Sequence, residues 1–231
     1  MKRFWREVTV EPEGAGWQVA LDGRRVKTAQ ARAQIVPTRG LGEALADEWR
    51  TQGEDVNPAG FGLRDMADYA IDIVAVDPAD AIRRILAYAE SDTLCYRAEP
   101  DEPLAARQRA AWEPLLKTAE QEYGVRFERV AGILHRPQPA ATLTAFGVRL
   151  KELDPFALAA LQTLASIAAS LVIGLAALEP GADAEALFAA SNLEEDWQAE
   201  QWSWDHEAEK TRARKLATFA AAVRFAERAR G

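Results

Sequence analysis

The chain contains a single cysteine, Cys95, and only two histidines, His135 and His206. One cysteine excludes an internal disulfide bond and is typical of proteins in a reducing compartment. Two histidines are too few for a metal cluster built on imidazole ligands. The sequence also lacks a glycine-rich phosphate loop, a nucleophile elbow and a supported Cys–His pair. We therefore expect no catalytic residues, no metal site and no cofactor.

Positive charge is absent from one long segment, residues 179–209. This segment holds ten acidic residues, no Lys or Arg, and three of the seven Trp residues. The net charge of the chain is −8, so the remainder, with 28 basic and 26 acidic residues, carries only +2. Without a basic face, the chain is not expected to bind nucleic acid.

Acidic residues and Trp rarely occur together in a segment of this kind. Acidic runs are usually solvated or disordered and poor in aromatics, whereas Trp is enriched where proteins meet their partners. We interpret the segment as a binding surface for a basic or apolar partner. The alternative is a solvated helix whose Trp side chains lie in the core.

The hydrophobic pattern changes once along the chain. Residues 4–36 alternate as short strands do, with an Asp-Gly turn signal at Asp22-Gly23 and a last short strand at 34–36. From Thr38, a predicted N-cap, helical spacing dominates. The fold class is therefore α+β, a small N-terminal antiparallel β domain followed by a larger all-helical C-terminal domain. The loop at 57–62 divides the chain into a β domain with one helix, residues 1–58, and a helical domain, residues 59–231.

The most apolar stretch, residues 154–178, predicts one buried central helix. Asp154 is its expected cap, Pro155 its first residue, and Pro180-Gly181 its end. About 24 helical residues are long enough to cross a bilayer. We nevertheless expect no membrane insertion, because polar side chains interrupt the stretch and no cationic flank marks one side of it.

The acidic segment can be analysed as a single helix over residues 193–207. At 100° per residue, Leu193, Trp197 and Trp204 share a face with Glu200, whereas Trp202 lies on another side. One indole face should pack on the apolar helix at 154–178, and the pattern does not say which face is inside.

Two classes of function are compatible with these carboxylates. Glu194, Glu195, Asp196 and Glu200 could bind a hard cation in a carboxylate-based metal- or small-molecule-binding enzyme, but they lack the alternation and turn glycine of a calcium loop. We favour a non-catalytic binding protein.

Short stretches along nearly the whole chain resemble the assembly chaperones that bind the alpha subunit of the F-type ATP synthase. The matching stretches include Phe4-Trp5, Gly16-Trp17, Leu21-Asp22-Gly23-Arg24, Val26-Lys27-Thr28, Glu48-Trp49 with Gln52, Ala70-Ile71-Asp72, Ser91-Asp92-Thr93-Leu94, Tyr96-Arg97-Ala98, Gln108 with Trp112, Leu153-Asp154, Ser170-Leu171, and Glu194-Glu195-Asp196-Trp197-Gln198-Ala199-Glu200 with Trp202 and Asp205.

This resemblance implies a chaperone that holds the free alpha subunit until the beta subunit replaces it. It implies no enzymatic activity, and we expect a monomer in the bacterial cytoplasm, or in the mitochondrial matrix for the mature form of a eukaryotic relative. The expected partner-binding residues lie in the acidic segment. They are Glu194, Glu195, Trp197, Gln198, Glu200, Trp202 and Asp205.

Overall fold

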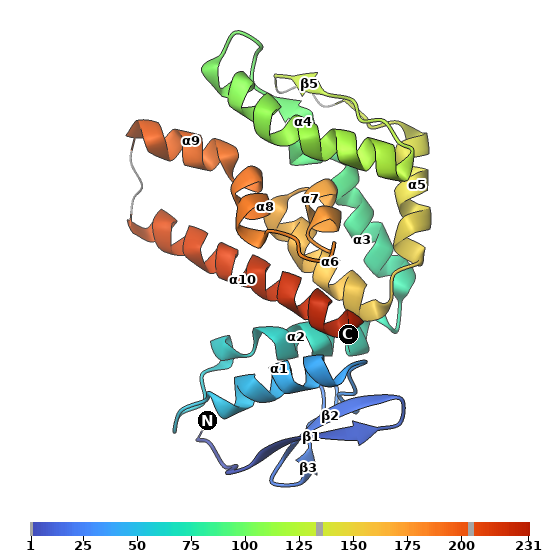
Figure 1. The fold of residues 1–231 in the computed structure, drawn as a ribbon, viewed down its shortest axis with the longest axis vertical. Helices are drawn as coiled ribbons and strands as arrows, with labels where there is room; N and C mark the ends of the chain where they lie inside the picture. The colour runs from blue at the N-terminus through green and yellow to red at the C-terminus, as the bar shows by residue number, and fades with distance from the viewer. Residues whose placement is uncertain (1, 133–135, 203–205) are drawn as a thin grey trace. The chain divides into compact units, whose positions relative to one another are not determined.

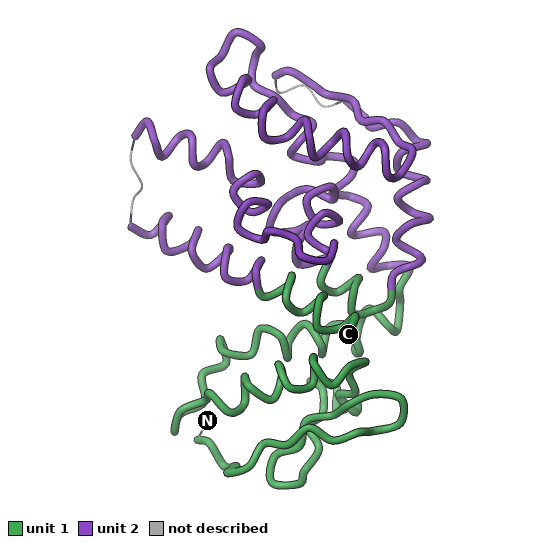
Figure 2. Tube along the Cα trace, in the orientation of Figure 1, with its two compact units in different colours: residues 1–78, 154–160, 221–231 green, residues 79–153, 161–220 purple. Residues whose placement is uncertain are grey.

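The structure is a computed structural model that describes residues 2–132, 136–202 and 206–231. The chain folds into two compact units (Figure 2). Unit 1 comprises residues 1–78, 154–160 and 221–231, and unit 2 comprises residues 79–153 and 161–220. The predicted boundary between residues 58 and 59 stays a prediction.

The chain runs through a short β region and then a series of helices (Figure 1). The elements are β1 Val8–Glu13, β2 Gly16–Leu21, β3 Arg24–Arg25, α1 Arg39–Arg50, the 3-10 turn η1 Pro58–Gly60, α2 Gly62–Tyr69, the π-helical turn η2 Ala70–Val74, α3 Pro78–Glu90, the 3-10 turn η3 Thr93–Cys95, β4 Tyr96–Arg97, α4 Pro103–Tyr123, β5 Val130–Ala131, α5 Ala140–Lys151, α6 Pro155–Ala168, α7 Leu171–Ala176, α8 Ala184–Ser191, α9 Leu193–Trp202 and α10 His206–Arg230.

Unit 1 is built on a three-stranded antiparallel sheet in the order β1-β2-β3. Asp22 and Gly23 both have positive φ, 47° and 75°, as the tight turn between β2 and β3 requires. Helix α1 packs on β1 and β2, and the Thr38 side chain caps it by accepting a hydrogen bond from Leu41 N at 3.0 Å. These elements confirm the predicted α+β class.

Two buried aspartates tie the chain after the sheet to helix α2 and turn η2. Asp72 accepts hydrogen bonds from Thr28 Oγ1 at 2.8 Å and from Gln30 N at 3.1 Å. Asp68 accepts hydrogen bonds from Gln34 Nε2 and from the backbone of Ala29. The donors satisfy carboxylates that would otherwise be costly to bury. The strand predicted at 34–36 is wrong, because Val36 makes only an isolated bridge to Trp17.

Unit 2 is centred on helix α4, which ends at Gly124 in the left-handed conformation, φ 63°. Helix α4 contacts η3, α7 and α9, and its Trp112 and Leu116 side chains are fully buried. Helix α5 was not predicted. Its sequence is preceded by two prolines and interrupted by Gly147, so it carries only a weak helical signal.

The predicted single helix over residues 154–178 is wrong, although most of this stretch is buried as expected. Asp154 caps α6, accepting a hydrogen bond from Phe156 N at 2.8 Å. Ala169 then adopts φ 47°, and the Ser170 side chain caps a new helix, α7, by accepting a hydrogen bond from Ile173 N. Among the described residues, no helix is both long and apolar enough to cross a membrane.

Candidate partner-binding site

Helix α9, which carries the centre of the acidic segment, lies beside α4, α8 and α10 within unit 2 (Figure 1). Asp196 on α9 forms an ion pair with Arg212 on α10, with atoms 2.6 Å apart. Sixteen residues of one straight helix would separate this pair by about 24 Å. The two helices therefore lie side by side, and the prediction of one helix over residues 193–207 is wrong.

Arg107 on α4 holds the outer half of α9. Its guanidinium carbon lies 4.3 Å from the centroid of the Trp197 ring, which is a favourable cation–π geometry. Arg107 Nη1 also donates to both carboxylate oxygens of Glu200, at 2.9 and 2.8 Å. Because Arg107 and Glu200 are about half exposed, solvent weakens this ion pair.

Two buried side chains of α4 position the inner end of α9. Gln108 is fully buried, its Nε2 donates to Glu194 Oε1 at 2.6 Å, and its Oε1 accepts from Ala98 N at 2.8 Å. The buried Trp112 donates its indole N–H to Ala190 O, at the end of α8. Glu194 is therefore fixed in place even though it is exposed to solvent.

The two described Trp residues of α9 have different surroundings. Trp202 is 78% exposed, and Trp197 is half-buried against Arg107. The ring contact of Trp197 is with Arg107 on α4, and the expectation that one indole face packs on the apolar stretch at 154–178 stays a prediction. No side chain of α9 is fully buried, which explains why its hydrophobic pattern could not be interpreted from the sequence.

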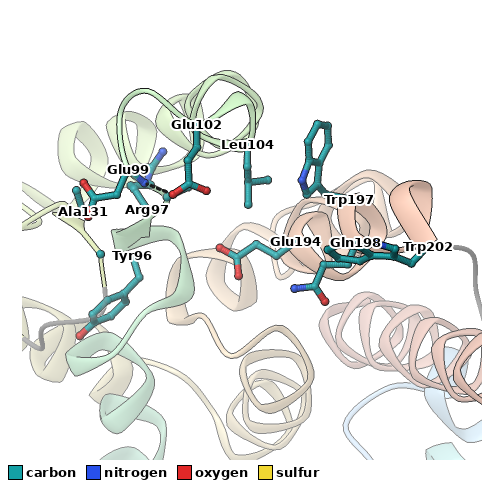
Figure 3. Close-up of a pocket in the computed structure, with 12 residues that line it drawn as sticks. Tyr96, Arg97, Glu99, Glu102, Leu104, Ala131, Glu194, Trp197, Gln198 and Trp202 are labelled. Atoms are coloured by element: carbon teal, nitrogen blue, oxygen red, sulfur yellow. Dashed lines mark hydrogen bonds between the residues drawn. The ribbon is translucent and has the colours of Figure 1, made fainter.

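An open groove of about 920 Å³ separates α9 from the segment that enters α4 (Figure 3). Strands β4 and β5, which pair in parallel, form its floor, and the 99–104 turn and α9 form its sides. The lining residues are Tyr96, Arg97, Ala98, Glu99, Glu102, Leu104, Ala131, Gly132, Glu194, Trp197, Gln198 and Trp202.

The groove carries more negative than positive charge. Three carboxylates line it, and Arg97 is the one cation among the lining residues. Arg97 is already engaged: its guanidinium lies over the Trp112 ring, 5.2 Å from the centroid, and approaches Glu113 at 3.5 Å. Burial lowers the pKa of this guanidinium, and Glu113 opposes that change. The groove therefore presents net negative charge beside an exposed indole.

The structure brings together four of the seven predicted site residues, since Glu194, Trp197, Gln198 and Trp202 all line the groove. Two others face elsewhere. Glu200 pairs with Arg107, and Glu195 lies 3.9 Å from Lys215 on α10. Asp205 falls outside the described residues.

Glu99 and Glu102 form the opposite side of this groove and are not among the residues predicted from the sequence. Both residues are exposed, and the backbone N–H of Glu99 donates to Glu102 Oε1 at 3.4 Å. The available signal was three acids, Glu99, Asp101 and Glu102, in a Pro-containing turn at residues 99–103, but a turn signal does not say which distant helix the turn faces.

These carboxylates do not form a metal centre. Among residues 2–132, 136–202 and 206–231, no group of three or more His, Cys, Asp or Glu side chains is placed to hold a metal ion. The buried Cys95 is also unsuited to nucleophilic chemistry, because burial raises the pKa of its thiol.

Known proteins resemble the chain in both sequence and structure. Residues 2–120 match the model of the family described as ATP12 chaperone protein. The mitochondrial protein atp12 of Schizosaccharomyces pombe is 24% identical over 213 residues, which cover 87% of this chain and 73% of that protein.

Two crystal structures match almost the whole chain. Atp12 from Paracoccus denitrificans is 33% identical and superposes with a TM-score of 0.92, covering 99% of this chain and 98% of that one. A protein from Agrobacterium tumefaciens is 40% identical, with a TM-score of 0.93 over 98% of this chain and 85% of that one. From its sequence and its fold, the chain belongs to the ATP12 chaperone family.

Proposed function

We propose that this protein binds the free alpha subunit of the catalytic sector of F-type ATP synthase and holds it until the beta subunit takes its place. One observation carries the proposal: the chain shares the fold of Atp12 from Paracoccus denitrificans over 99% of its length. This is a function of binding and release, without catalysis. It needs a surface rather than a reactive group.

The surface proposed for the client is the solvent-accessible surface of α9, which includes the groove side and the sides that carry Glu195 and Glu200. It comprises Glu194, Glu195, Trp197, Gln198, Glu200 and Trp202, and the proposal also includes Asp205, which is outside the described residues. A free alpha subunit exposes surface meant for its neighbours, and such surface aggregates. A chaperone that must later release it is best served by a modest patch with a polar rim.

Charge on this patch would favour rapid encounter without making release slow. An exposed Trp among carboxylates supplies one large apolar contact, and Trp is over-represented among the residues that dominate binding energy. We further propose that the chaperone acts as a monomer in the bacterial cytoplasm, because the net charge of −8 opposes self-association through the acidic face.

Capture of purified alpha subunit tests the proposal. Tagged chaperone should retain the alpha subunit, and adding beta subunit should release it. The Glu195→Lys variant should keep its melting temperature and lose capture, because a reversed charge repels a basic partner. Arg224→Glu, a charge reversal at an exposed position of α10 outside this patch, is the control and should capture normally. Failure of the unaltered chaperone to retain the alpha subunit would contradict the proposed function.

A further inference from the structure

We propose that the groove between α9 and the 99–104 turn receives a segment of the client in which a Lys or Arg stands next to a large apolar side chain. This inference rests on the proposed function and names the chemistry of the client segment. It also adds a second wall, outside the acidic segment, to the binding surface. Figure 3 shows the two walls and the floor between them.

The apolar part of the groove comes from four elements. Leu104 at the start of α4 faces Trp197 on α9, and Ala131 lies on the floor (Figure 3). Ala98 also lines the groove. Trp202, at the end of α9, is 78% exposed and extends this apolar surface outward. A Trp so exposed on a folded monomer is a typical mark of an interaction site. An apolar client side chain would cover it.

The charged part of the groove is negative on both sides. Glu194 stands on the α9 side, held by the hydrogen bond from the buried Gln108. Glu99 and Glu102 stand on the opposite side, in a turn closed by the hydrogen bond from Glu102 N to Glu99 O at 2.9 Å. A Cβ atom at Gly132, which has φ 78°, would lie 2.9 Å from Glu99 Oε1. The glycine therefore leaves room for this carboxylate over the groove floor.

Among the residues that the structure describes, the cations nearest the groove, Arg97 and Arg107, have other partners and leave these carboxylates available. Arg97 is turned toward Glu113 and the Trp112 ring, and it also donates to Leu94 O at 2.8 Å. Arg107 is held by Glu200 and Trp197 and is not part of the lining. A client ammonium or guanidinium group could therefore approach Glu99, Glu102 and Glu194 without displacing an existing ion pair at Glu99 or Glu102.

Charge complementarity identifies the occupant. A segment with Lys or Arg gains attraction from three carboxylates, whereas nucleic acid or an acidic peptide would be repelled. A second copy of this chain, with net charge −8, is also disfavoured. The exposed indole favours an apolar neighbour for that cation over a purely polar basic segment.

Fluorescence anisotropy with three labelled peptides of equal length tests the groove directly. One peptide alternates Lys with Leu, the second alternates Lys with Ser, and the third alternates Glu with Leu. The unaltered protein should bind the Lys-Leu peptide at least tenfold more tightly than either of the others. Equal affinity for the Lys-Leu and Lys-Ser peptides, or tighter binding of the Glu-Leu peptide, would overturn the inference.

A matched pair of double variants ties binding to the proposed wall. The double variant Glu99→Gln, Glu102→Gln should bind the Lys-Leu peptide and the alpha subunit three- to tenfold more weakly than the unaltered protein. Glu128→Gln with Glu185→Gln removes the same charge at exposed positions outside the groove and should change neither. If both double variants lose affinity equally, the loss is a general charge effect, and the proposal that the groove binds the client is overturned.

The same experiment separates the two proposals. Suppose that the double variant Glu99→Gln, Glu102→Gln captures the alpha subunit as well as the unaltered protein does. The proposal about the groove is then wrong, and the proposed function stands. If the Lys-Leu peptide binds in the groove but the alpha subunit is never captured, the proposed function fails, and the groove recognises basic–apolar segments of another protein.

Discussion

Helices α7 and α9 belong to the same unit but are held in opposite ways. Five of the six residues of α7 are buried, and a buried aspartate, Asp92, accepts a hydrogen bond from its Val172 N at 3.0 Å. None of the ten residues of α9 is buried, and ion pairs from Arg107 and Arg212 fix it. Helix α7 is part of the buried core, whereas α9 lies on the surface and is held by contacts between polar and charged side chains.

Truncating one side chain in each helix should give the largest difference in unfolding free energy between α7 and α9. Ile173 on α7 is fully buried, so Ile173→Ala should lower the free energy of unfolding by about 2–5 kcal/mol. Leu193 on α9 is half-buried, so Leu193→Ala should cost only about 1 kcal/mol. Urea denaturation of both variants measures the difference, and equal losses would contradict the distinction.

The pH dependence of stability should expose the buried cap of α7. Burial raises the pKa of Asp92 to about 6, against 3.8 in the unfolded chain, despite hydrogen bonds from the backbone and Ser170 that oppose the change. A pKa raised by folding means that the stabilising contribution is complete below about pH 4 and is lost as the pH rises through about 6. The loss should amount to about 3 kcal/mol.

Asp92→Asn is the control for this measurement, because the Asn side chain does not ionise in this pH range. Denaturation of both proteins between about pH 4 and pH 7.5 gives their difference in unfolding free energy at each pH. That difference should change across the interval. A constant difference would mean that Asp92 keeps its ordinary pKa in the folded protein.

The comparison also explains what the sequence could predict. Hydrophobic periodicity and turn residues identified β1, β2 and α1, because in these elements local pattern and burial agree. The break between α6 and α7 escaped prediction because a positive φ at Ala169 and a cap from Asp92, 80 residues before Val172, depend on tertiary contacts. Composition located the acidic segment, but the partners of α9 are single polar or charged side chains on α4 and α10, which no local pattern reveals.

Removing the Arg107 guanidinium, which lies over the Trp197 ring, should make local opening of α9 easier with little effect on the stability of the whole fold. Arg107→Ala loses the contact with the ring and the half-exposed pair with Glu200, so the free energy of unfolding should fall by about 1 kcal/mol or less. Amide hydrogen exchange should accelerate in residues 193–202 and stay unchanged in 171–176. Uniform acceleration in both helices would contradict a separate, weakly held α9.

The smallest effect is expected at the contact between α9 and α10. Glu195 is 57% exposed and 3.9 Å from Lys215, so Glu195→Gln should change the free energy of unfolding by no more than about 0.5 kcal/mol. A double-mutant cycle with Lys215→Gln measures the pair itself. A coupling energy well above about 1 kcal/mol would show that α9 is anchored more firmly than its exposure suggests.

The most direct test of the account is the affinity of the alpha subunit for Trp202→Ala, measured together with the melting temperature. Because Trp202 is 78% exposed, its removal should leave the melting temperature within a few degrees of the unaltered protein. As the main apolar contact of the surface, it should weaken binding at least tenfold. Unchanged affinity for the alpha subunit in a normally folded Trp202→Ala protein would contradict the claim that the solvent-accessible surface of α9 receives the client.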